Sequence, residues 1–382
     1  MRPLNLDEMF RRFFILLVFV LLSVQAYSQH RISAGVRSGY PFSPSKPLLD
    51  GVNSLGRPLN VAASADLQYG FEFPGSSYQG VGVSVFSLFD HEDVGTPVSV
   101  YVFQGARIAR LSRSLSLDYE WNFGVSFGWH RHDEHPYNII IGSKINAYIN
   151  GGIMLSWHPS DNWQLSVGPD FTHYSNGHTR LPNAGLNAVG IRLSAFGTFG
   201  GELFPRIAET SVPDRKWNDR ISCDVTVFGA LKKCVVDYHM KYYQADGHFA
   251  VAGIHINPFY DIHRHFRIGL SLDLSYDESA NLSDHIAGTT LDDHIRFFRP
   301  SFAEQFAMGL SVRAELVMPI FSVHFGVGHN IIYKGDDFRG LYQIVALKTR
   351  LTKNLYLHTG YQFWHFTDPG HLLLGLGWRF NR

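Results

Sequence analysis

The chain has 382 residues, of which 17% are charged and 14% are aromatic, with 36 glycines and only two cysteines. Its 33 basic residues balance its 33 acidic residues, so no bulk electrostatic attraction to nucleic acid is available and nucleic-acid binding is excluded. After residue 28 no uncharged apolar run approaches the roughly 18 to 20 residues that a membrane helix needs. A helical membrane protein is therefore excluded as well.

The N-terminus predicts a secretory signal peptide over residues 1–28. Two arginines precede an apolar run at residues 13–24, and the small residues Ala26 and Ser28 follow it. An uncleaved anchor helix is the alternative, but the run is too short to span a bilayer. We therefore expect export and cleavage near residue 28.

Alternation of apolar and polar residues with period two starts near residue 60 and predicts long strands. In residues 115–129 every even position is polar or glycine, and the odd positions are Leu115, Leu117, Tyr119, Trp121, Phe123, Val125, Phe127 and Trp129. Residues 143–158 and 372–380 repeat the pattern. Polar residues expected in the interior include Asp118, Glu120, Asn122, Lys144, Asn146 and Asn150.

Strands with one apolar and one polar face are typical of a closed transmembrane barrel, because lipid cannot satisfy an open sheet edge. A soluble β-sandwich is the alternative, although its strands are usually shorter. We predict an all-β fold, a single transmembrane antiparallel β-barrel of the outer membrane over residues 29–382. About 16 strands are expected, and 14 stay open because residues 232–248 are ambiguous.

Loop lengths orient the predicted barrel, because outer-membrane barrels have short periplasmic turns and longer external loops. Long segments alternate with short ones along the chain: 41–59 is long, 74–79 short, 91–96 intermediate, 112–114 short, 131–142 long and 158–162 short. The strand that begins at Trp163 is then the seventh and runs outward. Its far end is predicted to lie at the cell surface.

Polar residues collect at that far end. By the parity of the strand, His173 and Ser175 share the outward face of Phe171, while Asp170 and Thr172 face the interior. Polar groups on a lipid face are costly near the midplane but not at the interface, where this strand ends. A Ser-Asn-Gly turn beside an unrelated histidine is the alternative interpretation.

Taken whole, His173-Tyr174-Ser175-Asn176-Gly177 followed by residues 181–187 resembles the motif of the lipid A 3-O-deacylase (PagL-like) family, and more closely its Bacteroidetes acyloxyacyl hydrolase branch. Weaker similarity extends over residues 123–199. The smaller barrels of that family have eight strands, so residues 29–200 would carry the deacylase-like half. Residues 201–382 would then supply additional strands.

The resemblance implies an outer-membrane serine esterase that needs no cofactor. Ser175 would be the nucleophile and His173 the general base. Asn176 matches the oxyanion position, the backbone N–H of Gly177 is a second candidate donor, and Asn183 matches a further asparagine of the motif. The substrate would be an O-linked acyl chain of lipid A or a related glycolipid, entering from the membrane.

One residue departs from the smaller members of that family, in which a glutamate twelve positions beyond the serine orients the histidine. Here the residue is Asn187, and the parity of Val189 and Ile191 places it on the outward face. An asparagine oxygen can accept the histidine N–H and fix its tautomer, but it cannot stabilise imidazolium with a full charge. Slower catalysis, another orienting partner or an inactive enzyme are the outcomes to test.

Two further interpretations stay open: a porin-like or transport barrel, and a catalytically inactive barrel that binds lipid. Histidine and acidic residues crowd one external loop, but their spacing matches no metal signature, so we predict no metal site there: His130, His132, Asp133, Glu134 and His135. Cys223 and Cys234 could form a disulfide in an exported protein. The expected partners are lipopolysaccharide in the outer leaflet and the membrane itself.

Overall fold

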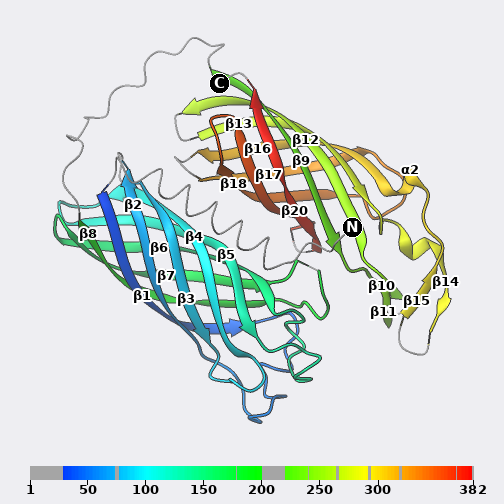
Figure 1. The fold of residues 1–382 in the computed structure, drawn as a ribbon, viewed down its shortest axis with the longest axis horizontal. Coiled ribbons are helices and arrows are strands. Elements are labelled where there is room, and N and C mark those ends of the chain that lie inside the picture. Colours follow the sequence, from blue (N-terminus) through cyan, green and yellow to red (C-terminus); the bar gives the residue numbers. More distant parts are fainter. Residues whose placement is uncertain are drawn as a thin grey trace, which may run out of the picture. The chain divides into compact units, whose positions relative to one another are not determined.

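The computed structural model describes residues 29–73, 77–177, 179–199, 220–239, 241–263, 266–290, 294–317, 321–366 and 368–380. The predicted signal peptide, residues 1–28, lies outside these ranges. Within them, no helix is long and apolar enough to cross a membrane. The described strands form two closed antiparallel barrels of eight strands each and one small four-stranded sheet (Figure 1).

Barrel 1 closes in chain order, each strand pairing with the next and β8 returning to β1. Its strands are β1 (Gln29–Phe42), β2 (Ala62–Phe73), β3 (Ser77–Ser87), β4 (Gly95–Arg110), β5 (Leu115–Trp129), β6 (Ile145–Ser160), β7 (Trp163–Ser175) and β8 (Leu186–Phe199). The long connections at 43–61, 88–94, 130–144 and 176–185 all join the ends at which β1, β3, β5 and β7 finish. By loop length this is the external end.

Barrel 2 closes by pairing β20 with β9. Its strands are β9 (Ile221–Lys232), β12 (Phe249–His263), β13 (Phe266–Asp277), β16 (Phe306–Val317), β17 (Phe321–Ile332), β18 (Leu341–Arg350), β19 (Leu355–Trp364) and β20 (Asp368–Phe380). The small sheet contains β10 (Val235–Tyr238), β11 (Lys241–Ala245), β15 (His294–Phe297) and β14 (Ile286–Thr289). Two short helices, η2 (Leu282–His285) and α2 (Phe302–Gln305), lie in the connection between β13 and β16.

The all-β, antiparallel outer-membrane barrel class is confirmed, but the prediction of a single barrel over residues 29–382 is wrong. Sixteen strands are present in barrels, as the higher estimate had it, yet they close in two sets of eight. Alternation identifies the lipid face of each strand, whereas closure depends on which distant strand returns to the first. In the ambiguous segment 232–248, Lys232 ends β9, and the strands that follow, β10 and β11, lie outside both barrels.

The predicted faces of β5 and β6 agree with the structure at all but two positions. Trp129 was expected on the lipid face, but Gly128 adopts φ 89° and turns it inward, where it is 2% exposed. A positive φ is accessible to glycine and reverses the alternation locally. Lys144 was expected in the interior, but it lies before β6 begins and pairs with Glu134 at 3.2 Å.

Charged side chains fill the interior of barrel 1. Arg37 contacts Asp66 at 3.0 Å and Asp170 at 2.7 Å, and Arg192 contacts Asp66 at 3.1 Å and also Glu120. All five are buried. Charges in such a place are tolerated when each has an opposite partner, and an eight-stranded barrel is narrow enough to be filled in this way.

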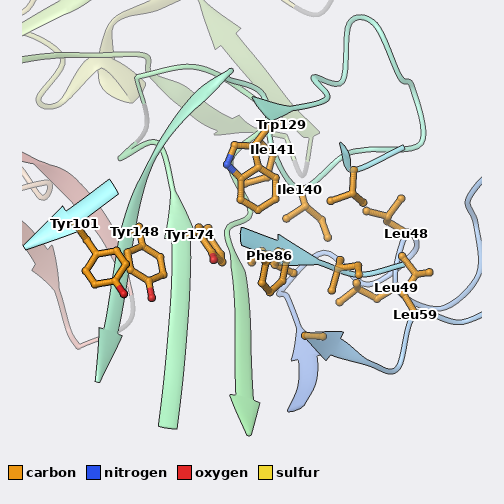
Figure 2. Close-up of a cluster of buried hydrophobic side chains, with 14 of the residues drawn as sticks. Leu48, Leu49, Leu59, Phe86, Tyr101, Trp129, Ile140, Ile141, Tyr148 and Tyr174 are labelled. Carbon is orange, nitrogen blue, oxygen red and sulfur yellow. The ribbon is translucent and has the colours of Figure 1, made fainter. Parts of the chain in front are cut away.

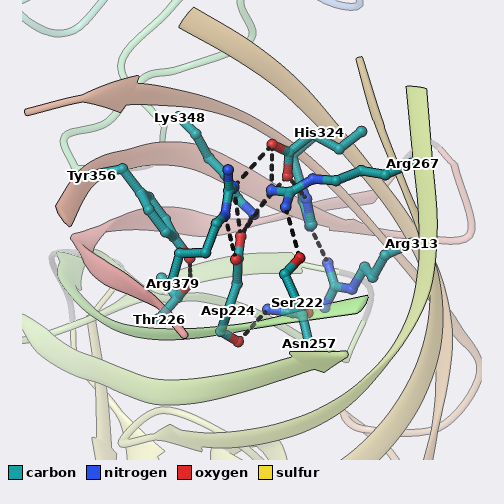
Figure 3. Close-up of polar contacts among 11 residues, drawn as sticks. Ser222, Asp224, Thr226, Asn257, Arg267, Arg313, His324, Lys348, Tyr356 and Arg379 are labelled. Atoms are coloured by element: carbon teal, nitrogen blue, oxygen red, sulfur yellow. Dashed lines mark hydrogen bonds and ion pairs between the residues drawn. The ribbon is translucent and has the colours of Figure 1, made fainter. Parts of the chain in front are cut away.

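Barrel 2 is filled by a separate network (Figure 3). Lys348 contacts Asp224 at 3.0 Å and Glu315 at 2.8 Å. Arg267 contacts the same two carboxylates, at 2.9 and 2.6 Å. Arg379 adds a contact of 2.8 Å to Asp224. Packed interiors of this kind in both barrels disfavour the porin-like alternative.

A hydrophobic cluster lies at the external end of barrel 1 (Figure 2). At that end it combines strand ends with three of the long connections: Leu48, Leu49, Leu59, Ala62, Phe86, Leu88, Val94, Trp129, Ile140, Ile141, Tyr174 and Leu186. The same cluster continues into the barrel through Tyr78, Tyr101, Phe103 and Tyr148. The ring centroid of Tyr174 lies 4.9 Å from that of Trp129 and 5.0 Å from that of Phe86. This external cluster fixes the end of β7, which carries the site.

Candidate active site

Two buried residues set the direction of the site's side chains. Tyr174 on β7 and Leu186 on β8 are each 1% exposed within the external cluster. Because successive side chains of a strand point to opposite faces, His173, Ser175 and Asn187 must point away from the cluster, toward lipid. Burial of the Tyr174 and Leu186 side chains in the external cluster therefore places the three polar side chains on the outer surface.

The three polar groups form a hydrogen-bonded chain. His173 Nε2 lies 2.9 Å from Ser175 Oγ, and His173 Nδ1 lies 2.7 Å from Asn187 Oδ1. His173 and Asn187 are direct cross-strand partners in the β7–β8 register. An amide oxygen can only accept, so Nδ1 carries the proton and Nε2 presents a lone pair to the Ser175 hydroxyl. This is the arrangement in which a histidine can remove a serine proton.

The other residues of the motif shape the turn after Ser175. The backbone N–H of Asn176 donates to Asn183 Oδ1 at 2.9 Å, and Asn176 Nδ2 donates to the carbonyl of Arg180 at 2.8 Å. Gly177 adopts φ 62°, a conformation that favours glycine. Asn183 thus holds the turn, while Asn176 retains a second amide hydrogen.

Two residues near the site were missed by sequence reasoning. Gly185 has φ 75°, and a Cβ placed there would lie 3.3 Å from His173 Cε1 and 3.8 Å from Ser175 Cβ. The buried hydroxyl of Ser43 donates to the Gly185 carbonyl at 2.7 Å. Ser43 follows the last residue of β1, which reaches the site only because β1 closes the barrel against β8. The glycine inside the motif was the available signal for Gly185.

Apolar side chains surround the hydrogen-bonded chain on the lipid face. Ile149 is paired with His173 across β6 and β7, and Phe42 is paired with Asn187 across β1 and β8. Phe171 and Val189 lie one row deeper, and all four side chains are exposed on the outside of the barrel. The three polar groups therefore border the surface that contacts acyl chains.

The histidine-rich loop does not form a metal cluster. No group of three metal-ligating side chains occurs in the part of the chain that the structure describes. His130 and His135 stack with ring centroids 4.2 Å apart. Hydrogen bonds from Arg131 and then Lys144 lower the pKa of Glu134 to about 2. Elsewhere, Cys223 and Cys234 are free cysteines and form no disulfide.

Two family models match the chain. Residues 108–195 match the lipid A 3-O-deacylase (PagL) model, and residues 221–382 match the acyloxyacyl hydrolase C-terminal domain model. Together they match more than half of the chain and describe one family of hydrolases. The chain belongs to the PagL family. The first match includes His173, Ser175 and Asn187, and the second covers barrel 2 from the start of β9.

Similar solved structures include the outer-membrane enzyme PagL, which is 16% identical, covers 43% of this chain and 97% of its own, and has a TM-score of 0.29. Neisserial surface protein A is 8% identical, with coverages of 45% and 97% and a TM-score of 0.31. The siderophore receptor PirA from Pseudomonas aeruginosa is 10% identical, with coverages of 92% and 81% and a TM-score of 0.27. No curated protein matches the sequence.

Proposed function

We propose that this PagL family member is an outer-membrane serine esterase that removes an O-linked acyl chain from lipid A or a related glycolipid of the outer leaflet. The observation that supports the proposal is the hydrogen-bonded chain from Asn187 through His173 to Ser175 on a lipid-facing surface. A water-soluble ester would not be concentrated at a surface that faces lipid. A glycolipid presents its ester at this depth without leaving the membrane.

In the first half of the reaction, Ser175 Oγ attacks the ester carbonyl while its proton passes to His173 Nε2. The tetrahedral intermediate collapses when the sugar oxygen leaves with that proton, and the acyl group stays on Ser175. In the second half, water gives its proton to His173 and attacks the acyl-enzyme. The fatty acid leaves, and the proton returns to Ser175.

The negative oxygen of the tetrahedral intermediate needs hydrogen-bond donors. The free amide hydrogen of Asn176 and the backbone N–H of Gly177 follow Ser175 directly in the chain and are the donors we assign. The absence of a side chain at Gly185 leaves space beside His173 and Ser175. A substrate could occupy that space without displacing the base.

Asn187 keeps His173 in the productive tautomer but gives the imidazolium no compensating full charge. We therefore propose an active enzyme whose proton transfer is less favourable than with a carboxylate at this position. Export by a cleaved signal peptide ending near residue 28 completes the proposal, since the site must reach the outer leaflet.

The experiment that tests this function is mass spectrometry of lipid A from cells that express the chain or its Ser175→Ala variant at equal levels in the outer membrane. We expect loss of one acyl chain with the unaltered protein and intact lipid A with the variant. Identical lipid A in both strains, in the presence of folded protein, would contradict the proposal.

A further inference from the structure

The outward side chains of β5, β6 and β7 form cross-strand rows, and one row contains a gap. Ala147 lies beside Ser175, and two outward positions deeper Gly151 lies between Trp121 on β5 and Phe171 on β7. A Cβ at Gly151 would meet no atom closer than 3.9 Å. Gly151 is thus a place on the lipid face where a side chain is missing and its space is open.

Both aromatic neighbours of Gly151 are drawn away from it. The indole N–H of Trp121 donates to Gln104 Oε1 on β4, and Gln104 Nε2 donates to Tyr119 Oη at 2.9 Å. On the other side, the ring of Phe171 packs against Phe42, with centroids 6.3 Å apart. Trp121 is therefore bonded toward β4 and Phe171 packs toward β1, and Gly151 between them stays partly exposed.

We propose that this notch, made by Gly151 between Trp121 and Phe171, receives the distal part of the acyl chain whose ester lies at Ser175. The inference rests on the esterase function proposed above and adds a determinant of chain length to it. Ala147 and Gly151 are four positions apart on β6, a distance of roughly 13 Å along the strand. A long fatty acyl chain spans that distance, whereas a short one ends before it.

The expected selectivity comes from packing. An acyl chain in the bilayer is already in an apolar medium, so burial against protein gains little from the hydrophobic effect. What the notch supplies is close contact with the β6 backbone and two aromatic rings, in a place that a larger side chain would fill. Filling the notch should therefore penalise long chains selectively.

The test compares hydrolysis of a tetradecanoyl ester and a butanoyl ester of one alcohol by purified, detergent-folded protein. For Gly151→Leu we expect the ratio of kcat/KM for the long ester to that for the short ester to fall at least about tenfold, since steric exclusion in an acyl site has effects of that size. Gly229→Leu is the matched control. Gly229 is an outward glycine of β9 in barrel 2, whose Cβ would meet only a backbone oxygen at 3.5 Å, and the ratio should be unchanged.

A second variant tests the same notch while leaving Gly151 unchanged. Gln104→Leu removes the acceptor that holds Trp121, so Trp121 should swing over Gly151 and lower the same ratio by a smaller factor, about threefold. An unchanged ratio in Gly151→Leu, while Ser175→Ala abolishes hydrolysis, would overturn the notch and leave the esterase intact. Hydrolysis that survives Ser175→Ala would instead overturn the proposed function.

Discussion

Barrel 1 and barrel 2 each present a histidine on the outer face near the C-terminal end of a strand, but the surroundings of the two histidines differ. On β7, His173 is followed two residues later by Ser175 and faces Asn187 across the hairpin. On β17, His329 is followed two residues later by Ile331 and faces Leu341 on β18. Its Nδ1 bonds only the neighbouring carbonyl of Asn330, at 2.6 Å. An outward histidine becomes a candidate base only with a hydroxyl on one side and an acceptor on the other.

The largest effect is expected from removing the proposed nucleophile of barrel 1, Ser175. Ser175→Ala should lower ester hydrolysis by at least about a hundredfold, because among the described residues Ser175 supplies the one hydroxyl hydrogen-bonded to His173. Ser38→Ala, which removes a lipid-facing serine of β1 on the same barrel, is the control and should hydrolyse normally. Retained hydrolysis in Ser175→Ala, measured on protein with unchanged heat-modifiability on gels, would remove Ser175 as nucleophile.

The residue that faces the histidine is the second difference between the barrels: it is Asn187 in barrel 1 and Leu341 in barrel 2. Asn187→Ala should lower turnover by roughly one to three orders of magnitude, because His173 loses the acceptor that fixes its tautomer. Asn187→Glu should retain or raise turnover, since a carboxylate at the wet interface accepts the same N–H and also stabilises imidazolium. Turnover numbers of both variants decide this, and equal turnover in Asn187→Ala and the unaltered chain would exclude Asn187 as orienting residue.

Alanine substitutions at two glycines distinguish crowding of the site from backbone strain. Gly185→Ala places a Cβ 3.3 Å from His173 Cε1 at φ 75°, so we expect about a tenfold loss of kcat as the base is displaced. Gly247→Ala provides the strain alone, because Gly247 has φ 96° and nothing within 4 Å of a Cβ. Similar small losses of thermal stability should accompany both substitutions. Equal kcat in the two variants would show that the space beside His173 is not used.

The smallest effect on hydrolysis is expected from the interior of barrel 2. Lys348→Met leaves Asp224 and Glu315 short of a buried cation and should destabilise that barrel by about 3 kcal/mol. A lower temperature for the heat-modifiability shift would measure this. Hydrolysis at 25 °C should be unaltered, because no step of the proposed reaction uses barrel 2. A parallel loss of kcat at that temperature would mean that barrel 2 supports the chemistry.

Much of this fold could be predicted from the alternation of apolar and polar residues at odd and even strand positions. The bounds predicted for β5 from alternating residues agree with Leu115–Trp129 in the structure, and the same parity placed His173, Ser175 and Asn187 on one face. Parity does not report which strands close a barrel, so two barrels were predicted as one. It also does not report backbone reversals, which is why Trp129 was assigned to the wrong face after Gly128.

The neighbours of the site were harder to predict for the same reason. Ser43 contacts Gly185 only through the pairing of β1 with β8, strands separated by most of barrel 1 in the sequence. At the proposed notch, Trp121 donates to Gln104, and Gln104 donates in turn to Tyr119, so the position of Trp121 involves a residue of another strand. Some contacts depend on which strands close the barrel, and others depend on a side chain that reaches over a neighbouring strand. Neither kind leaves a periodic pattern in the sequence.

The central claim is that Ser175, activated by His173, is a nucleophile that faces the membrane. Labelling the folded protein in outer-membrane vesicles with an alkyl fluorophosphonate, followed by peptide mass spectrometry, tests it most directly. We predict one covalent adduct, on Ser175, that is absent from Ser175→Ala and forms at least about a hundredfold more slowly in His173→Ala. An adduct on another residue, or equal labelling rates with and without His173, would contradict the account.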